Sequence, residues 1–434
     1  GEEPAMTEFL AAVADNPIYW GLMAFLAAFP VVIAALAVNA SRQYLLDRSR
    51  SDTEQYLPHL SDLVEARKLW PTMSIVIPAR NEQDTITDTV DAALAIDWPQ
   101  LEVTIINDGS VDGTGEALRR YENHSHIRIV THESPEGKSR SLNEGLAMAT
   151  SELVLIMDAD ARPARNVLDR LVPHLYKYPD VAAVTGNPRV VNARKLWGKL
   201  QAIEFTSTIS TLRRGQAAWG RVNTVSGILT VLRRDVVLEV GGFSPTQPTE
   251  DIELTWRLHR EGWRCTYEPA AQVGMVVPET LSQWWKQRYR WSSGLIRVLQ
   301  AHGGLILRRW RWRIFPLLLE ASLSIIWCHV LIASTLLWIV AYTVGGPELG
   351  NTLIIGHWGS MTIGIAIVQI LWGMHLDANH DKTITKLWPL APIYPLLYWW
   401  LEAIVVVAAT VPTLLTRAKT STWSLNASRP PRTT

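Results

Sequence analysis

Two aspartates separated by one alanine, Asp158 and Asp160, end a short apolar run in the segment ELVLIMDAD. Residues i and i+2 of an extended strand point to the same side, so this spacing predicts that both carboxylates share one side of a strand end. Such like charges repel unless a cation compensates them, and Mg²⁺ or Mn²⁺ bound by carboxylates and substrate phosphates is a common solution. The pair therefore predicts a metal–diphosphate site, with a solvated loop as the alternative.

Further polar residues follow the apolar runs upstream. IPARNE places Ala79 and Glu82 at the end of one run, and NDGS places Asp108 at the end of the next. Asp–Gly by itself is ordinary turn chemistry, but ligands of open parallel sheets bind beyond the carboxyl ends of the strands. Lys138 in PEGKSRS opens a helix, a position that favours an anion, although the spacing is not that of a P-loop. Together these residues predict a nucleotide crevice beside DAD.

A second acidic pair, Glu250 and Asp251 in TED, opens a predicted helix. Both are either first-turn acids favoured by the helix dipole or, beside the crevice, a carboxylate that accepts a proton from a hydroxyl nucleophile. The sequence leaves the two interpretations open. Upstream, VSG places Ser226 and Gly227 in the turn before another apolar run.

The stretch TLSQWWKQRYRWSSGLIRVLQ mixes aromatic residues with cations. This mixture is typical of an amphipathic helix at a membrane surface. Its QRYRW motif is more specific, because Arg290 is suited to neutralise a leaving diphosphate and Trp291 offers a flat face to a sugar ring.

These residues need a scaffold that positions them, and the pattern of apolar and helical stretches in residues 71–276 predicts one. Apolar, β-rich runs alternate with helical stretches, and this alternation indicates an α/β domain of largely parallel strands joined by helices.

Apolar blocks flank that domain, and the first of them, residues 18–38, carries no charge. Residues 18–38 are long enough, at about 1.5 Å per residue, to cross a hydrocarbon core of roughly 30 Å. Arg42, Arg48 and Arg50 follow this block, so the positive-inside tendency places the domain in the cytoplasm. Residues 314–416 predict about three spans or re-entrant segments, since prolines interrupt the last block.

Two further details of this membrane region concern its charged residues and its linker. Residues 345–351 contain no lysine or arginine and are expected to form a linker on the outer face. Glu320 and Glu402 lie inside apolar blocks, where a carboxylate marks a polar conduit or is bonded between helices.

The predicted organisation is an N-terminal segment (1–17), a transmembrane helix (18–38), a linker (39–70), the α/β domain (71–276), amphipathic interface helices (277–313), the membrane region (314–416) and a tail (417–434).

Composition excludes several classes of protein. The 434 residues are 48% hydrophobic with a formal charge of +0, whereas a nucleic-acid-binding protein usually shows a basic footprint. Cys265 and Cys328 are the two cysteines, too few for a disulfide framework or a cysteine-rich zinc site.

The ordered set IPARNE, NDGS, EGK, DAD, TED and QRYRW, covering Pro78 to Trp291, resembles the processive, membrane-embedded family 2 glycosyltransferases, relatives of cellulose, chitin and hyaluronan synthases. VTGNPRV, GKLQAIEF, NTVSG and VPETLSQWWKQRYRW look similar to bacterial poly-β-1,6-N-acetylglucosamine synthases. The chain departs from that pattern in RWSSGL, where those relatives commonly read RWAQGG, and in GGFSPTQP before TED.

The resemblance implies a GT-A-like (Rossmann-like) mixed-sheet domain in the cytoplasm, flanked by transmembrane and interfacial helices, in the inner membrane of a bacterium. It implies a processive, inverting enzyme that polymerises N-acetylglucosamine from UDP-N-acetylglucosamine and passes poly-β-1,6-N-acetylglucosamine across the bilayer. The implied partners are the UDP-sugar, the growing polysaccharide, the lipid bilayer and a small membrane accessory subunit, with no nucleic acid.

Three alternatives remain. One is a UDP-sugar polymerase of the hyaluronan, chitin or cellulose type, and another is a transferase that puts one sugar on a lipid carrier. A transporter or receptor with a nucleotide-sensing domain belongs to a different class and predicts no turnover.

The resemblance also implies roles for single residues. The donor-binding residues are Ala79, Glu82, Asp108, Lys138 and Asp158. The metal, Mg²⁺ or Mn²⁺, is bound by Asp160 with Asp158. The catalytic residues are Asp251 as the general base, its neighbour Glu250, and Arg290 facing the diphosphate. The acceptor-binding residues are Gln287, Trp291, Ser226 and Gly227.

Overall fold

The computed structural model describes residues 8, 11–13, 15–51, 71–218, 220–308, 313–353 and 357–416 of the chain. The predicted tail, most of the predicted linker and most of the N-terminal segment lie outside these residues. The side chains of Arg42, Arg48 and Arg50 are also outside the description, so the predicted orientation in the membrane rests on the sequence.

Eight strands within the described residues form one mixed sheet, in the order β3-β2-β1-β4-β7-β6-β8-β5. The first four neighbours are parallel, β7 runs antiparallel to both β4 and β6, and β8 is parallel to β6. This arrangement confirms the predicted mixed α/β sheet. The strands are β1 Met73–Ala79, β2 Leu101–Asp108, β3 Ile127–His132, β4 Leu153–Met157, β5 Arg162–Pro163, β6 Val181–Val190, β7 Leu229–Arg233 and β8 Arg264–Met275.

The central strand β1 explains why its sequence is apolar throughout, because all seven of its residues are buried. Ile75 and Ile77 pack into the core on one face of the sheet, whereas Val76 packs into the core on the other. The register pairs Ala79 with Asn107 of β2, and Val76 with Ile156 of β4. The loops that carry IPARNE, NDGS and DAD therefore leave the sheet at the same edge.

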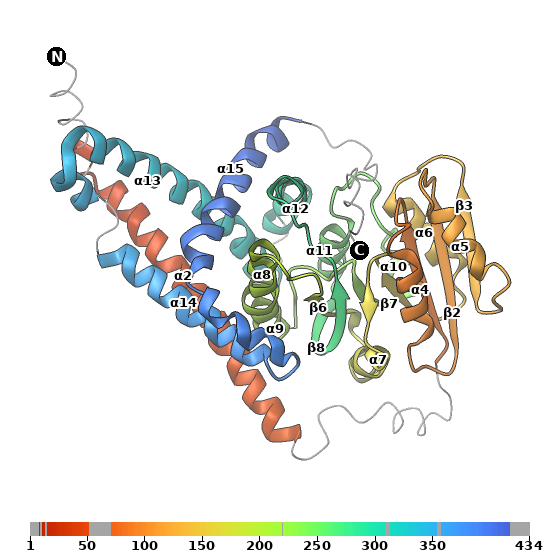
Figure 1. The fold of residues 1–434 in the computed structure, drawn as a ribbon. Helices are drawn as coiled ribbons and strands as arrows, with labels where there is room; N and C mark the ends of the chain where they lie inside the picture. Colours follow the sequence, from red (N-terminus) through yellow and green to blue (C-terminus); the bar gives the residue numbers. More distant parts are fainter. Residues whose placement is uncertain are drawn as a thin grey trace.

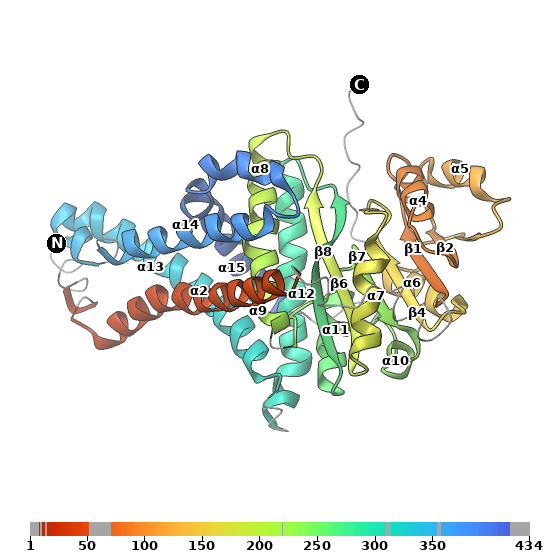
Figure 2. The same cartoon turned by 90° about the horizontal axis from the view of Figure 1, so that it is seen from below.

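Helices cover both faces of the sheet (Figures 1 and 2). Helices α4 and α7 contribute to one core, and α6, α10 and α11 contribute to the other. Their bounds are α4 Ile86–Leu94, α5 Thr114–Leu118, the 3₁₀ turn Arg119–Tyr121, α6 Lys138–Met148, α7 Val167–Lys177, α10 Arg234–Glu239 and α11 Glu250–Arg260.

One long helical segment joins the sheet to the apolar helices. It consists of α8 Leu196–Ile203, the π-helical turn η2 Glu204–Ile209 and α9 Ser210–Ala218. Before the π turn, Ile203 belongs to an apolar cluster with Tyr398. After it, Arg214 pairs with the fully buried Asp377 at 2.7 Å, and Arg189 of β6 pairs with the other oxygen of the same carboxylate.

The remaining helices gather beyond the β6–β8 side of the sheet, far from β3 (Figure 1). Helix α2 packs against α9 and α14, and α15 packs against α12 and α13. Their bounds are α2 Pro17–Ser51, α12 Leu281–Arg308, α13 Phe315–Leu353, α14 His357–Asp377, the 3₁₀ segment η3 Lys382–Leu390, the π turn η4 Tyr394–Tyr398 and α15 Trp399–Leu415.

Two helical segments of the described chain, Phe315–Thr343 and Tyr394–Leu415, are long and apolar enough to cross a membrane. Pro17–Ile33 and Thr362–Asp377 are shorter apolar helices. The structure corrects one expectation here, because α13 continues through residues 345–351, where a linker was expected. The three glycines and one proline of that stretch lower helix propensity, but propensity is a weak prior that the rest of a structure overrides.

The two carboxylates of the apolar blocks each face a polar group of a neighbouring helix. Nε2 of Gln216 donates to both oxygens of Glu320 at 3.0 Å. Oε1 of Glu402 lies 3.4 Å from Nε of Arg288. Both contacts agree with the second of the two interpretations, a carboxylate held between helices.

Candidate active site

The loops after β1 and β2 are tied to each other by hydrogen bonds. Asn81 has φ 56°, a left-handed conformation that asparagine tolerates better than most residues. Its backbone N–H donates to Oγ of Ser110, and its side-chain oxygen accepts from the N–H of Val111. The backbone N–H of Glu82 likewise donates to Oγ1 of Thr114 at 2.8 Å. IPARNE and NDGS thus form one rigid rim next to the buried end of β1 at Ala79.

Asp108 holds the loop that leads to Lys138. Its side chain is fully buried, and its two oxygens accept from the backbone N–H groups of Glu136 and Gly137 at 2.8 Å each. A carboxylate used in this way fixes the EGK backbone in front of α6, where Gly137 adopts φ 105°. Asp108 therefore acts on the crevice through this loop.

His132, at the end of β3, reinforces the same loop. Its Nδ1 lies 2.7 Å from Asp108, and its Nε2 lies 2.7 Å from Glu144 of α6. Burial lowers the pKa of His132, but the hydrogen bonds to both carboxylates and their negative charges outweigh burial, so the pKa is raised. The charged imidazole, which donates from both nitrogens, satisfies both contacts.

Lys138 lies between two carboxylates from different parts of the chain. Its Nζ is 2.7 Å from Oδ1 of Asp158 and 2.8 Å from Oε1 of Glu250. Gly227 allows the VSG loop to approach this cluster, since a Cβ there would lie 3.1 Å from Nζ of Lys138. EGK, DAD, VSG and TED thus meet at one point.

The DAD segment departs from the predicted geometry. β4 ends at Met157, and a turn follows in which the N–H of Ala161 donates to the carbonyl of Asp158. The i, i+2 alternation of a strand therefore does not apply to Asp158 and Asp160, because β4 ends before the first aspartate and a turn spans Asp158 to Ala161. Both aspartates are half-buried in this turn.

The donor set at this turn fits a hard divalent cation. No group of three or more His, Cys, Asp and Glu side chains in the described part of the chain gathers around one point. Mg²⁺ needs only one or two protein carboxylates when substrate phosphates and water complete its shell. The half-buried Asp158 and Asp160 can supply those carboxylates.

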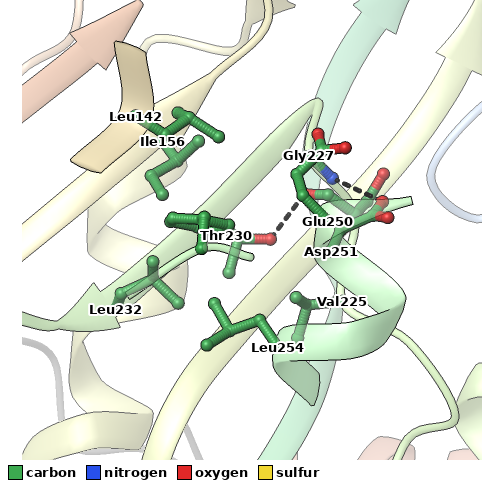
Figure 3. A pocket seen from close by; sticks show the side chains of 11 residues that line it. Leu142, Ile156, Val225, Gly227, Thr230, Leu232, Glu250, Asp251 and Leu254 are labelled. Atoms are coloured by element: carbon green, nitrogen blue, oxygen red, sulfur yellow. Dashed lines mark hydrogen bonds between the residues drawn. The ribbon is translucent and has the colours of Figure 1, made fainter. Parts of the chain in front are cut away.

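TED opens α11 against the VSG loop (Figure 3). Oδ2 of Asp251 accepts from the backbone N–H of Gly227 at 3.3 Å. Burial and then the neighbouring charge of Glu250 raise the pKa of Asp251. Burial also acts to raise the pKa of Glu250, but the positive charge and hydrogen bond of Lys138 outweigh it and lower that pKa. The two adjacent acids therefore differ, with Glu250 paired to a lysine and Asp251 the more basic carboxylate.

The pocket at this point has an apolar floor and a polar rim (Figure 3). Leu142, Ile156 and Leu254 line it from α6, β4 and α11, and the acids of TED lie at its rim. Ser226 is held by its N–H, which donates to Oγ1 of Thr185 at 2.9 Å.

The helix α12 brings QRYRW next to TED. Nη1 of Arg290 donates to the carbonyl of Pro248 at 3.4 Å, and its charge contributes to lowering the pKa of Glu250. The buried Oε1 of Gln287 has no hydrogen-bond partner among the described residues. Trp291 lies edge-to-face with Phe205 of η2, with ring centroids 6.5 Å apart. The side chains proposed for diphosphate and acceptor thus project from one helix.

The sequence did not single out three contacts that shape this site. His132 follows the same strand-end rule as Asp108, so its position was the available signal. Gly294 of α12 touches Thr249, and Arg288 stacks on Trp291. The contact of Gly294 with Thr249 joins segments that are far apart in the sequence, so nothing in the local pattern indicates it. Arg288 and Trp291 are three residues apart on one helix, so their spacing was the available signal.

Comparison with known proteins agrees with this geometry. Residues 71–294 match the family described as "Glycosyltransferase like family 2". Poly-β-1,6-N-acetyl-D-glucosamine synthases of Staphylococcus epidermidis and of Staphylococcus aureus strain MSSA476 are each 33% identical over 81% of this chain and 86% of their own length.

Among solved structures, the mannosyltransferase PcManGT from Pyrobaculum calidifontis, in complex with GDP-Man and Mn²⁺, has a TM-score of 0.59 and 22% identity. The match covers 90% of this chain and 99% of that one. This likeness supports the GT-A-like fold. The chain is a glycosyltransferase and belongs to family 2.

Proposed function

We propose that this glycosyltransferase polymerises N-acetylglucosamine from UDP-N-acetylglucosamine into poly-β-1,6-N-acetylglucosamine. The observation that carries the proposal is the meeting of Lys138, Asp158 and Glu250 beside Asp251, with α12, the helix that carries Trp291, packed against α11. The synthases of the two staphylococci, similar over most of the chain, support the choice of sugar and polymer.

The donor nucleotide is proposed to lie along the rim formed by IPARNE, NDGS and EGK. Ala79 and Glu82 flank the uridine, Asp108 keeps the EGK loop in place, and Lys138 meets the diphosphate. Lys138 is held by two carboxylates in the structure, so a diphosphate replaces carboxylate contacts that the lysine already makes. Asp158 then lies next to the ribose and diphosphate.

We assign the metal to Asp160 together with Asp158, with Mg²⁺ and Mn²⁺ both suited to carboxylate oxygens. When bound, the ion neutralises the charge that develops on the leaving diphosphate. Arg290 contributes positive charge from α12, and this charge already helps to lower the pKa of Glu250.

Asp251 is proposed to act as the general base. The acceptor hydroxyl oxygen attacks the anomeric carbon, the bond from that carbon to the diphosphate oxygen breaks, and the hydroxyl proton passes to the Asp251 carboxylate. This single displacement inverts the anomeric centre without a covalent enzyme intermediate. The raised pKa of Asp251 favours this role, because a base works best when its pKa lies nearer the operating pH.

The acceptor end of the polymer is proposed to rest on Trp291, with Gln287, Ser226 and Gly227 beside it. An indole face suits a sugar ring, and the buried side-chain oxygen of Gln287 has no partner in the described part of the chain.

We further propose a multi-pass protein of the bacterial inner membrane, with the catalytic domain in the cytoplasm and the product passed outward. Two segments long and apolar enough to span support this placement. A small membrane accessory subunit is a further proposed partner.

The test uses the purified full chain in lipid nanodiscs, with release of UDP from UDP-N-acetylglucosamine as the readout. Asp251→Asn is expected to lower turnover by about 10²- to 10⁴-fold, the contribution of a general base, while leaving UDP binding intact. Asp235→Asn, an exposed aspartate of α10, is the matched control and stays fully active. Retained turnover in Asp251→Asn contradicts the base assignment.

The nature of the product is tested by offering a panel of UDP-sugars and digesting any polymer with linkage-specific glycosidases. A β-1,6-linked N-acetylglucosamine polymer supports the proposal. A different polymer, or transfer of one sugar to a lipid carrier, contradicts the proposed product and supports one of the alternatives. If no UDP-sugar is turned over, the proposed function is wrong.

A further inference from the structure

Arg288, the second residue of QRYRW, is buried where three elements meet. Its side chain is 4% exposed, and its guanidinium makes a two-pronged contact with Glu204, from Nη1 to Oε1 at 2.7 Å and from Nη2 to Oε2 at 2.6 Å. Such a planar fork fixes the orientation of both groups. Arg288 therefore holds one defined position between α12 and η2.

A tyrosine hydroxyl from the last apolar segment completes this contact. The hydroxyl of Tyr398 donates to Oε2 of Glu204 at 2.8 Å, and it accepts from Nε1 of Trp284 at 2.7 Å and from Nη2 of Arg288 at 3.3 Å. Glu402, one turn further on, lies 3.4 Å from Nε of Arg288. The cluster thus joins α12 to the catalytic domain through Glu204 and to the α15 segment through Tyr398.

The same guanidinium lies over the ring of Trp291, with Cζ 4.4 Å from the ring centroid. Residues 284, 288 and 291 follow the spacing of four and three that places side chains on one helix face. Phe205, the neighbour of Glu204 in η2, also contacts Trp291, with the two rings edge-to-face. Two consecutive residues of one π turn therefore restrain Arg288 and Trp291 together.

Both elements that hold Arg288 are π-helical. Glu204 begins the turn η2, and Tyr398 ends the turn η4. π turns are rare and are frequently found at functional sites. Their coincidence around one buried arginine points to a role beyond ordinary helix packing.

We propose that Arg288 is the positioning residue of the acceptor site: its guanidinium, fixed by Glu204 and Tyr398, orients the Trp291 ring on which the sugar rests. The inference rests on the proposed role of Trp291. It adds that the orientation of this ring is set jointly by the catalytic domain and by the segment that leads into α15.

The test compares Arg288→Lys, Trp291→Leu and the double variant, as full-length protein in lipid nanodiscs. UDP-N-acetylglucosamine is the donor, and a short β-1,6-linked N-acetylglucosamine oligosaccharide is the added acceptor. Lysine keeps the buried positive charge beside Glu204 but loses the planar fork and the stacked contact. Lys286→Gln changes an exposed cation of the same helix and serves as the control.

Arg288→Lys is expected to raise the acceptor KM by about tenfold, in the range of coupling between contacting residues, while the donor KM changes less than about twofold. The double variant is expected to match Trp291→Leu, because Arg288 acts through that ring. The control leaves both constants unchanged.

Several outcomes overturn the inference. If Trp291→Leu raises the acceptor KM but Arg288→Lys does not, or if the two effects multiply, Arg288 does not act through Trp291. If Trp291→Leu leaves the acceptor KM unchanged, the proposed acceptor site itself is wrong. Should Arg288→Lys lose UDP binding through misfolding, Tyr398→Phe replaces it, with a rise of about threefold expected and multiplication with Trp291→Leu again contradicting the inference.

Discussion

Gly294 of α12 is where the catalytic helix α11 and the QRYRW helix come into direct contact. A Cβ at position 294 would lie 2.1 Å from Oγ1, 2.4 Å from Cγ2 and 2.8 Å from Cβ of Thr249. Thr249 immediately precedes Glu250, and Gly294 follows Trp291 by three residues. The contact therefore sets the distance between Asp251, the proposed base, and Trp291, the proposed acceptor-binding residue.

Gly294→Ala is expected to separate these helices. Ordinary contact begins near 3.4 Å, so the closest atom falls short of it by about 1.3 Å, and rotation of the threonine cannot relieve the clash with its Cβ. Overpacking of this kind costs about 1–3 kcal/mol. A misplacement of about 1 Å at a site that depends on orientation costs about 10²-fold in rate. We expect kcat to fall about a hundredfold while the protein remains folded.

The assay measures kcat for UDP release together with the melting temperature of the same preparation. Gly304→Ala, on the same helix with open space around it, is the matched control and should keep full activity with a slightly higher melting temperature. Thr249→Ala removes the two closest atoms and should restore part of the rate in the Gly294→Ala background. A kcat of Gly294→Ala within about twofold of the wild type would refute the reasoning.

Three further predictions concern the donor side of the site. Because the folded pKa of His132 is raised, its clamp on Asp108 is present below the ordinary value of about 6.5 and is lost as the pH rises through the raised pKa. The donor KM should therefore increase with pH in the wild type, and a flat profile would contradict the clamp; His132→Gln should abolish this increase. Lys138→Met should destabilise the protein by about 3 kcal/mol, because Glu250 is left buried and unpaired. Adding Glu250→Gln should recover part of the melting temperature, and no recovery would show that the pair does not account for the loss. Removal of divalent metal with a chelator should stop turnover until Mg²⁺ or Mn²⁺ is restored, and Asp160→Ala should raise the metal concentration needed by more than about tenfold. Unchanged metal dependence in Asp160→Ala would contradict the assignment of Asp160 as a metal ligand.

Local sequence rules predicted the parallel half of the fold. The apolar runs that became β1, β2 and β4 are buried on both faces, and the residues that follow them meet at one edge because parallel strands end together. The strand-end rule predicted that IPARNE, NDGS and DAD converge on one crevice near EGK, whereas the residues left the role of TED open and only the resemblance implied it. The rule that carried this prediction is topological and needs no side-chain detail.

The side-chain geometry of the candidate site depended on contacts between segments that are distant in the sequence. The backbone turn after Met157 removed the strand alternation on which the Asp158–Asp160 geometry was predicted. The bridge of Lys138 between two carboxylates, the fit of Gly294 against Thr249 and the burial of Arg288 each arise only when separate elements pack. Periodicity and composition describe one element at a time, so they could not indicate these contacts.

The π turn at Glu204–Ile209 divides one helical segment into two halves with different partners. An extra residue in a helical turn rotates everything beyond it by about 100°. Ile203 therefore packs against the aromatic cluster of Tyr398, whereas Arg214 reaches Asp377 of α14. Deleting a single residue within this turn would rotate α9 relative to α8. The segment could then no longer contact both the Tyr398 cluster and Asp377.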